Sequence, residues 1–176
     1  SIDYNLSTTW TPRMTGINPA TDFLMYVAMP QNDINTCYIG GSNTSSELNV
    51  VKTTNGGTNW THVFTTASNQ NLYTGWCGTG GDRGWSYAES VFGIAVAPQN
   101  ANKVIITDFG FVHKTADGGA TWHQAYINPT DENPAGSNTP LYQSYAGIGL
   151  ENTTCWQTFW IDEQNIYAGF SDIKGI

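Results

Sequence analysis

Two aspartates stand where a pair of carboxyl groups could act on a glycosidic bond. Asp108 follows the apolar run 104–107, and Asp172 follows the apolar run 166–170, so both are expected at the same end of a strand. A glycosidase uses two carboxyl groups about 5–10 Å apart, one as general acid and one as base or nucleophile. We therefore take Asp108 and Asp172 as the candidate catalytic pair. The alternative is that each aspartate caps a local turn.

A second candidate site is the segment 75–89, which gathers aromatic, charged and glycine residues. Aromatic rings flanked by carboxylates suit a sugar, because the apolar face of the sugar stacks on the ring while polar side chains bind its hydroxyl groups. The candidate ligand-binding residues are Trp76, Asp82, Arg83, Trp85, Tyr87 and Glu89. The alternative is that Trp76 and Trp85 fill the core beneath their own loop and that Asp82 and Arg83 form a turn.

Neither the histidines nor the cysteines have the spacing of metal ligands. His62, His113 and His123 stand at strand positions, where packing or surface roles are expected. The three cysteines, Cys37, Cys77 and Cys155, are too far apart for a zinc site, and their disulfide pairing stays open. We expect no cofactor and no catalytic metal. A structural calcium ion held by loop oxygens stays open, although no EF-hand spacing supports it.

The composition excludes several classes of function. Charged residues make up 11% of the 176 residues, against about a quarter in an average globular protein. The net charge is −8, and the six basic residues are spread along the chain, which argues against binding to nucleic acid or to an anionic membrane. No stretch of about 18 apolar residues is present, so no membrane insertion is expected.

An internal repeat organises the chain. The nine-residue phrase at 52–60, KTTNGGTNW, returns at 114–122 as KTADGGATW. The stretch 27–32 before the first phrase aligns with 95–100 before the second, and a third, shorter copy starts near Trp156. Such a period marks an array of similar supersecondary units.

Each unit is expected to contain four short strands. The first strands are predicted near 23–29, 91–97 and 156–161, the second near 37–40, 103–107 and 166–170, and the third near 49–53 and 111–115. An Asx-Gly-Gly turn then leads into a strand that begins at Trp60 or Trp122, because Gly supplies positive φ and Asx bonds the following amides. No segment has a helical period of apolar residues. The predicted fold class is therefore all-β.

The phrase at 115–122 resembles the Asp-box, or BNR repeat, whose consensus is Ser/Thr-x-Asp-x-Gly-x-Thr-Trp. The copy at 53–60 departs from it at Asn55 and Asn59 but keeps Gly57 and Trp60. The resemblance covers about 130 residues and implies a β-propeller of the kind found in sialidases, xyloglucan-type glycoside hydrolases and sortilin-like receptors. It implies packing rather than catalysis for the motif residues Thr53, Asn55, Gly57, Trp60, Thr115, Asp117, Gly119, Thr121 and Trp122.

The resemblance also implies that this chain is an incomplete propeller of about two and a half four-stranded blades. Closed propellers have about 4–8 blades, so the remaining blades of the same propeller are the first expected partner. The expected division is a lead-in at 1–22, blades at 23–65 and 91–127, long loops at 66–90 and 128–155, and a partial blade at 156–176. The repeat predicts a third Gly-Gly-x-x-Trp phrase within about 12 residues after Ile176.

Propeller connectivity would place the long inserts 41–48, 66–90 and 128–155 on one face, opposite the Asp-box turns. We expect that face to bind a glycan or an extracellular protein partner. The alternative is a glycoside hydrolase of the xyloglucanase-like branch, whose active site is completed by the missing blades. The sialidase reading is disfavoured because such enzymes use an arginine triad, and this chain has only Arg13 and Arg83. We expect a secreted or cell-surface protein, with the periplasm left open.

Overall fold

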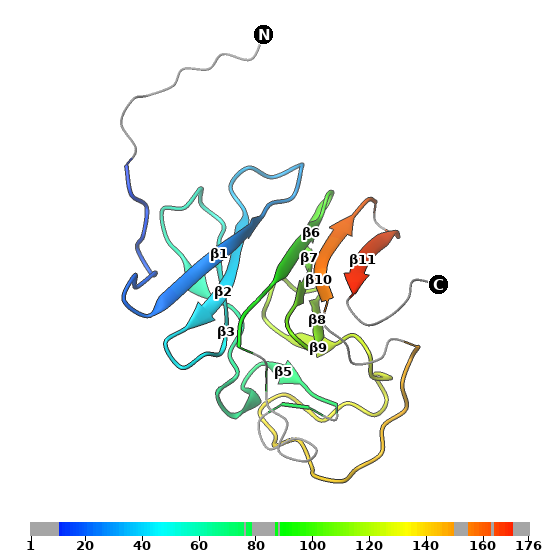
Figure 1. Cartoon of the computed structure of the whole chain (residues 1–176). Coiled ribbons are helices and arrows are strands. Elements are labelled where there is room, and N and C mark those ends of the chain that lie inside the picture. Colours follow the sequence, from blue (N-terminus) through cyan, green and yellow to red (C-terminus); the bar gives the residue numbers. More distant parts are fainter. Residues whose placement is uncertain are drawn as a thin grey trace.

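The computed structural model describes residues 11–75, 77–78, 87, 89–149, 155–162 and 164–170. Within these ranges the chain is all-β, apart from the single 3-10 turn η1 (Ala67–Asn69). None of the described helical residues forms a segment long and apolar enough to cross a membrane. The strands form three successive sheets, which lie side by side in Figure 1.

The first sheet is an antiparallel meander of four strands in sequence order. Its strands are β1 (Asp22–Ala28), β2 (Cys37–Asn43), β3 (Leu48–Thr53) and β4 (Thr61–His62). The second sheet repeats this meander and adds one strand, β5, at its outer edge. Its strands are β6 (Gly93–Ala97), β7 (Asn100–Thr107), β8 (Val112–Thr115), β9 (Trp122–Gln124) and β5 (Leu72–Tyr73). The third sheet has two described strands, β10 (Cys155–Trp160) and β11 (Ile166–Phe170).

These strands lie where the sequence predicted strands, with one addition. β5 falls inside the segment 66–90, which was expected to be a loop, and it pairs in parallel with β9. Two residues are too few to give a hydrophobic period, so the sequence carries no sign of this strand. The chain that leaves the first sheet therefore runs along the outer edge of the second sheet before it enters that sheet.

The two nine-residue phrases form turns with the same hydrogen bonds. In the first, the Thr53 hydroxyl accepts from the Gly57 amide at 3.0 Å, and the side chain of Asn55 accepts from the Asn59 amide at 2.9 Å. In the second, Thr115 accepts from the Gly119 amide at 3.0 Å, and Asp117 accepts from the Thr121 amide at 2.9 Å. Gly57 and Gly119 have φ values of 82° and 90°, which glycine adopts without strain.

The hydrogen bonds shift part of the sequence alignment by one residue. The sequence placed Asn32 opposite Asn100, but the Asn35 amide donates to Asp33 and the Asn102 amide donates to Asn100, at 2.9 and 3.0 Å. Asp33 is therefore the structural counterpart of Asn100. Both hairpin turns contain similar polar residues, so the sequence alone could not fix the register between them.

The main core lies between the first and second sheets. Tyr38 and Val50 of the first sheet are fully buried in one cluster with Val104, Ile106 and Trp122 of the second sheet. The second sheet packs its opposite face, at Ile105 and Val112, against the partly buried Trp160 of β10. Each face of the second sheet therefore has a neighbouring sheet, and the strands β1, β6 and β10 bring the three sheets together in Figure 1.

Each repeat tryptophan ties its turn to chain that comes earlier in the sequence. The Trp122 indole N–H donates to the carbonyl of Val63 at 2.6 Å, and the Trp60 indole donates to the carbonyl of Arg13 at 2.9 Å. The backbone amide of Trp122 donates to the carbonyl of Asn71, and that of Trp60 to the carbonyl of Thr15, both at 2.8 Å. The segment 13–15 thus holds the first sheet in the way that 63–71 holds the second.

Candidate functional site

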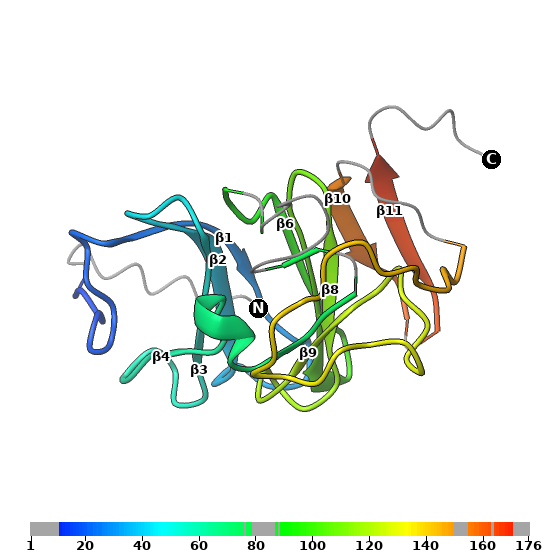
Figure 2. The ribbon, with the colours of Figure 1, turned by 90° about the horizontal axis from the view of Figure 1, so that it is seen from below.

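The long connections gather at one end of the sheets. Figure 1 shows the β2–β3 turn, η1 and the segment 128–149 at the lower end, while the β1–β2 turn lies at the opposite end. The view from below in Figure 2 brings η1 and much of the segment 128–149 toward the viewer. Loops gathered at one end of a rigid scaffold are the usual place for a binding site.

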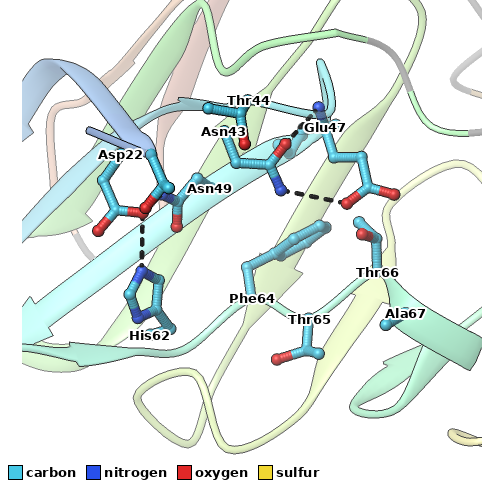
Figure 3. A pocket seen from close by; sticks show the side chains of 12 residues that line it. Asp22, Asn43, Thr44, Glu47, Asn49, His62, Phe64, Thr65, Thr66 and Ala67 are labelled. Atoms are coloured by element: carbon cyan, nitrogen blue, oxygen red, sulfur yellow. Dashed lines mark hydrogen bonds and ion pairs between the residues drawn. The ribbon is translucent and has the colours of Figure 1, made fainter. Parts of the chain in front are cut away.

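At this end, the first sheet carries a pocket of about 350 Å³ with a mostly polar lining. Its walls come from the start of β1, the β2–β3 turn, the outer strand β4 and the chain that leads to η1 (Figure 3). The lining residues are Thr21, Asp22, Asn43, Thr44, Glu47, Leu48, Asn49, His62, Phe64, Thr65, Thr66 and Ala67. Phe64 is 4% exposed and belongs, with Leu48, to the main core beneath the pocket.

Asp22 is held in place on one side of the pocket by three groups. Its carboxylate accepts hydrogen bonds from the Asn18 amide at 2.8 Å and from the Asn49 side-chain amide at 3.0 Å, and it lies 3.2 Å from the His62 ring nitrogen Nε2. Burial raises the pKa of Asp22, but the hydrogen bonds from Asn18 and His62, together with those from Asn49, outweigh burial and lower the pKa below 3.8. Asp22 is therefore an anion at neutral pH.

The opposite side of the pocket is the β2–β3 turn. The side-chain oxygen of Asn43 accepts from the amides of Ser45 and Glu47, at 2.9 and 3.1 Å, which closes the turn. The side-chain nitrogen of Asn43 donates to the Glu47 carboxylate at 3.1 Å. Figure 3 shows Asp22 and Glu47 on either side of the Phe64 ring.

The arrangement is chemically suited to binding hydroxyl groups. Carboxylates, side-chain amides and threonine hydroxyls together offer both donors and acceptors, which can pair with hydroxyl groups of a ligand. None of the lining residues that the structure describes is an arginine or a lysine. The one histidine among these described residues, His62, already contacts Asp22, so they offer little to an anionic group.

Of the candidate catalytic pair, the structure describes only Asp108. Asp108 is fully buried at the end of β7, and one carboxylate oxygen accepts from the amides of Gly110 and Phe111, at 2.8 and 2.6 Å. Its other oxygen lies 3.4 Å from the ring nitrogen Nε2 of the buried His113. These are the bonds of a turn cap, the alternative weighed from the sequence. Asp172 lies outside the described residues, so its pairing with Asp108 stays a prediction.

The candidate ligand-binding segment 75–89 is described only in part. Trp76, Asp82, Arg83 and Trp85 lie outside the described residues. Tyr87 packs edge-on against Phe64 with ring centroids 6.2 Å apart, and its hydroxyl donates to Asn69 at 2.7 Å. Burial raises the pKa of Tyr87. Tyr87 thus fastens the segment to the core, while Glu89 is exposed.

The sequence did not point to the residues that line the pocket. Asp22, Glu47 and His62 come from three separate segments, and none belongs to a recognisable motif. A packing or surface role was expected for His62, and its side chain is 46% exposed and in contact with Asp22. The one available signal was the polar run 43–47 between two strands, which predicts a turn but no ligand.

A third histidine–carboxylate contact lies on the second sheet. The His123 ring nitrogen Nδ1 is 2.7 Å from Glu132, and the ring stacks on Tyr73 with centroids 4.5 Å apart. Burial raises the pKa of Glu132, and the hydrogen bond from His123 only partly offsets this. Within the described ranges, no three His, Cys, Asp or Glu side chains are grouped so that they could hold a metal ion.

Neither a family model nor a curated protein matches this chain. Among solved structures, the chain is similar to the crystal structure of the GH74 enzyme from Niastella koreensis, with a TM-score of 0.43 and 15% sequence identity. The similarity covers 85% of this chain and 26% of that enzyme chain. The present chain therefore spans about a quarter of the enzyme's length.

Proposed function

We propose that this chain is part of a secreted Asp-box β-propeller and that the pocket of Figure 3 binds an uncharged glycan. The observation that carries the binding proposal is the pocket itself. Two carboxylates, amides and hydroxyl groups surround one aromatic ring at the end of the sheets where the long connections gather. The hydroxyl groups of a sugar can pair with donors and acceptors of this kind.

The propeller proposal rests on the repeated sheets. Two antiparallel meanders follow each other, pack face to face and carry turns with the same hydrogen bonds. Stacked units that each bury a face against the next are the architecture of repeat proteins and propellers. The turn at 115–122 then corresponds to an Asp-box, and the turn at 53–60 to a variant with Asn55 in place of Asp.

The first sheet supports the proposal that further blades of the same propeller are partners of this chain. Val104 of the second sheet is buried against the first sheet, and its counterpart in the first sheet is Cys37. Cys37 instead lines an apolar hollow of about 270 Å³ together with Met29, Ile34 and Trp60. A preceding sheet of the same kind would fill this hollow as the first sheet fills the space beside Val104.

An uncharged glycan fits the electrostatics better than a sialylated one. The chain carries a net charge of −8, and Asp22 is held as an anion in the pocket. Anionic sugars would be repelled unless arginine or lysine side chains paired with them. The lowered pKa of Asp22 keeps it from serving as a general acid at neutral pH.

The binding proposal is tested by calorimetric titration of the whole chain with cellohexaose and with sialyllactose. We expect binding of cellohexaose only, and about two- to tenfold weaker binding after Glu47→Gln, because one hydrogen-bonded charge is lost. Asp162→Asn is the matched control, since Asp162 is exposed and does not line the pocket. Equal loss in both variants, or preference for sialyllactose, would overturn the proposal.

The hydrolase alternative has a separate test. The full-length protein is incubated with β-glucan and xyloglucan, and released reducing ends are measured. Release that disappears in Asp108→Asn and Asp172→Asn, at an unchanged thermal midpoint, would establish the hydrolase and its carboxyl pair. Retained binding without release would leave the glycan-binding proposal as the function.

A further inference from the structure

The apolar hollow of the first sheet has a counterpart on the second sheet. In each sheet, one backbone hydrogen bond joins the first hairpin to the repeat turn. The Gly56 amide donates to the Asn35 carbonyl at 3.0 Å, and the Gly118 amide donates to the Asn102 carbonyl at 2.9 Å. Asn35 and Gly56 both line the hollow. The surface around Asn102 and Gly118 is therefore the equivalent surface, one repeat unit later.

On the second sheet, two side chains of the first sheet cover this surface. The Tyr38 hydroxyl donates to the Ala101 carbonyl at 2.8 Å. The Lys52 ammonium donates to the Gly118 carbonyl at 2.9 Å and lies 5.2 Å from the centre of the Tyr38 ring. A β-carbon added at Gly118 would lie 2.5 Å from the Lys52 ammonium and 3.4 Å from the Tyr38 hydroxyl, so the two side chains fill the space in front of this turn.

The first sheet presents the same two carbonyl groups without such a cover from the described residues. The first carbonyl belongs to Ile34, the counterpart of Ala101, and the second belongs to Gly56. Ile34 is 82% exposed. A β-carbon added at Gly56 would have its nearest contact, the Asn35 side chain, at 3.6 Å. The position that Tyr38 and Lys52 fill on the second sheet is thus open on the first.

The charges around the two surfaces differ, and they limit the group that can approach Gly56. Burial lowers the pKa of Lys52, and the attraction of the Asp117 carboxylate partly offsets this effect. On the first sheet, Asn55 stands in place of that aspartate. Arg13 is the one charged residue among the described residues that line the hollow. An ammonium group would lack a counter-charge there and would be repelled by Arg13, so an uncharged donor fits better.

We propose that the apolar hollow is the docking site of a preceding repeat unit of the same protein, which inserts a tyrosine ring and an uncharged hydrogen-bond donor. The tyrosine hydroxyl donates to the Ile34 carbonyl, and the second group donates to the Gly56 carbonyl. This occupant follows from continuity with the interface that the first sheet already makes with the second. The inference rests on the proposed propeller and names the side chains that join its units.

The Cys37 thiol reports whether the hollow is covered. Cys37 lines the hollow and is half-buried, whereas its counterpart Val104 is fully buried beneath the first sheet. Alkylation of Cys37 by iodoacetamide is followed by peptide mass spectrometry at about pH 9, because burial raises the pKa of this thiol. We expect Cys37 to react at least about tenfold faster in this chain than in the full-length protein, where a covered thiol reacts only after local opening.

Val104→Cys is the matched control, because it places a thiol of similar size in the covered interface of the same chain. This thiol should react at least about tenfold more slowly than Cys37. Adding Tyr38→Ala should make it reactive, since the ring that covers the surface is removed. A thiol at position 104 that reacts as fast as Cys37 would overturn the comparison of the two surfaces.

Two amino-acid amides test the chemistry of the occupant on the chain itself. N-acetyltyrosinamide and N-acetylphenylalaninamide should both slow the alkylation of Cys37. We expect the tyrosine amide to act at a concentration about two- to tenfold lower, because its hydroxyl adds one hydrogen bond to the Ile34 carbonyl. Ile34→Ala should weaken both amides and keep their ratio, since the backbone carbonyl remains. Equal action of the two amides on the unmodified chain would overturn the role of tyrosine.

The full-length protein separates this inference from the propeller proposal. If a repeat unit precedes this chain and Cys37 still reacts as fast as in the chain alone, the docking site is refuted and the propeller proposal stands. If no repeat unit precedes the chain, both are refuted. A Cys37 that is already protected in the chain alone would show that another part of the chain covers the hollow, which also overturns the inference.

Discussion

Replacing Gly119 with alanine is expected to destabilise the chain more than the same replacement at Gly57. The two glycines hold the same place in the two repeat turns, with φ values of 90° and 82°. A left-handed backbone costs an alanine about 1–2 kcal/mol, so both variants should lose at least this amount. The turn strain is therefore matched between them.

The difference comes from the neighbouring sheet. A β-carbon at Gly119 would lie 2.8 Å from the β-carbon of Val63, whereas one at Gly57 would have its nearest contact at 3.6 Å. The first distance is a clash with the preceding strand segment, and overpacking of this kind costs about 1–3 kcal/mol. We therefore expect a loss of about 2–5 kcal/mol for Gly119→Ala and about 1–2 kcal/mol for Gly57→Ala.

Urea unfolding of the two variants, followed by tryptophan fluorescence, measures these losses as shifts of the midpoint at constant slope. The double variant Gly119→Ala/Val63→Ala should recover part of the loss, because the smaller side chain at 63 leaves room for the new methyl group. Equal losses at Gly57 and Gly119, or no coupling between positions 119 and 63, would refute the close packing of the two repeat units.

Three further predictions concern single hydrogen-bonded groups. Trp122→Phe should cost about 1–3 kcal/mol in urea unfolding, because its indole is buried and donates to the preceding sheet, while Trp60→Phe, whose indole is less buried, should cost less. Partial burial raises the pKa of Asp117, but the hydrogen bonds of Thr121 lower it below 3.8, so stability should fall as the pH drops through the folded value. Asp117→Asn should flatten that decline in urea titrations between about pH 6 and pH 2, and an unchanged slope would count against the bonds seen in the turn. The pKa of Glu132 is raised above 4.5 by burial, so its contribution to stability is present below pH 4.5 and is lost as the pH rises through the folded value. Glu132→Gln should abolish this loss in a thermal-midpoint series, and a wild-type midpoint that is flat over that range would contradict the direction of the shift.

The strands of this chain could be predicted because their boundaries are marked locally. Asn55 and Asp117, each followed by Gly-Gly, indicate the tight turns. The apolar runs between the turns are too short to form helices. β5 could not be predicted, because Leu72 and Tyr73 become a strand only through their pairing with Trp122 and His123. Pairing of that kind depends on the tertiary structure and leaves no local pattern.

The polar pocket could not be predicted for a related reason. Asp22, Asn43, Glu47 and His62 lie in three short segments that the fold brings together, and each residue type is common in surface turns. For Asp108, the sequence offered both a catalytic and a turn-capping role, and its bonds to the amides of Gly110 and Phe111 are those of a cap. Carboxylates near strand ends serve both purposes, so only their partners tell the roles apart.

The outer edges of the first two sheets bear on the self-association of this protein. An exposed sheet edge presents unpaired amides and carbonyls that can recruit a second chain and start aggregation. β5 covers part of the edge of β9. At the first sheet, the backbone amide of Trp60, next to the short strand β4, donates to the carbonyl of Thr15. Each connector thus shields the edge of the sheet that follows it. A chain that begins after residue 17 would lose this cover at the first sheet, and light scattering should show it aggregating at concentrations where the whole chain stays monomeric.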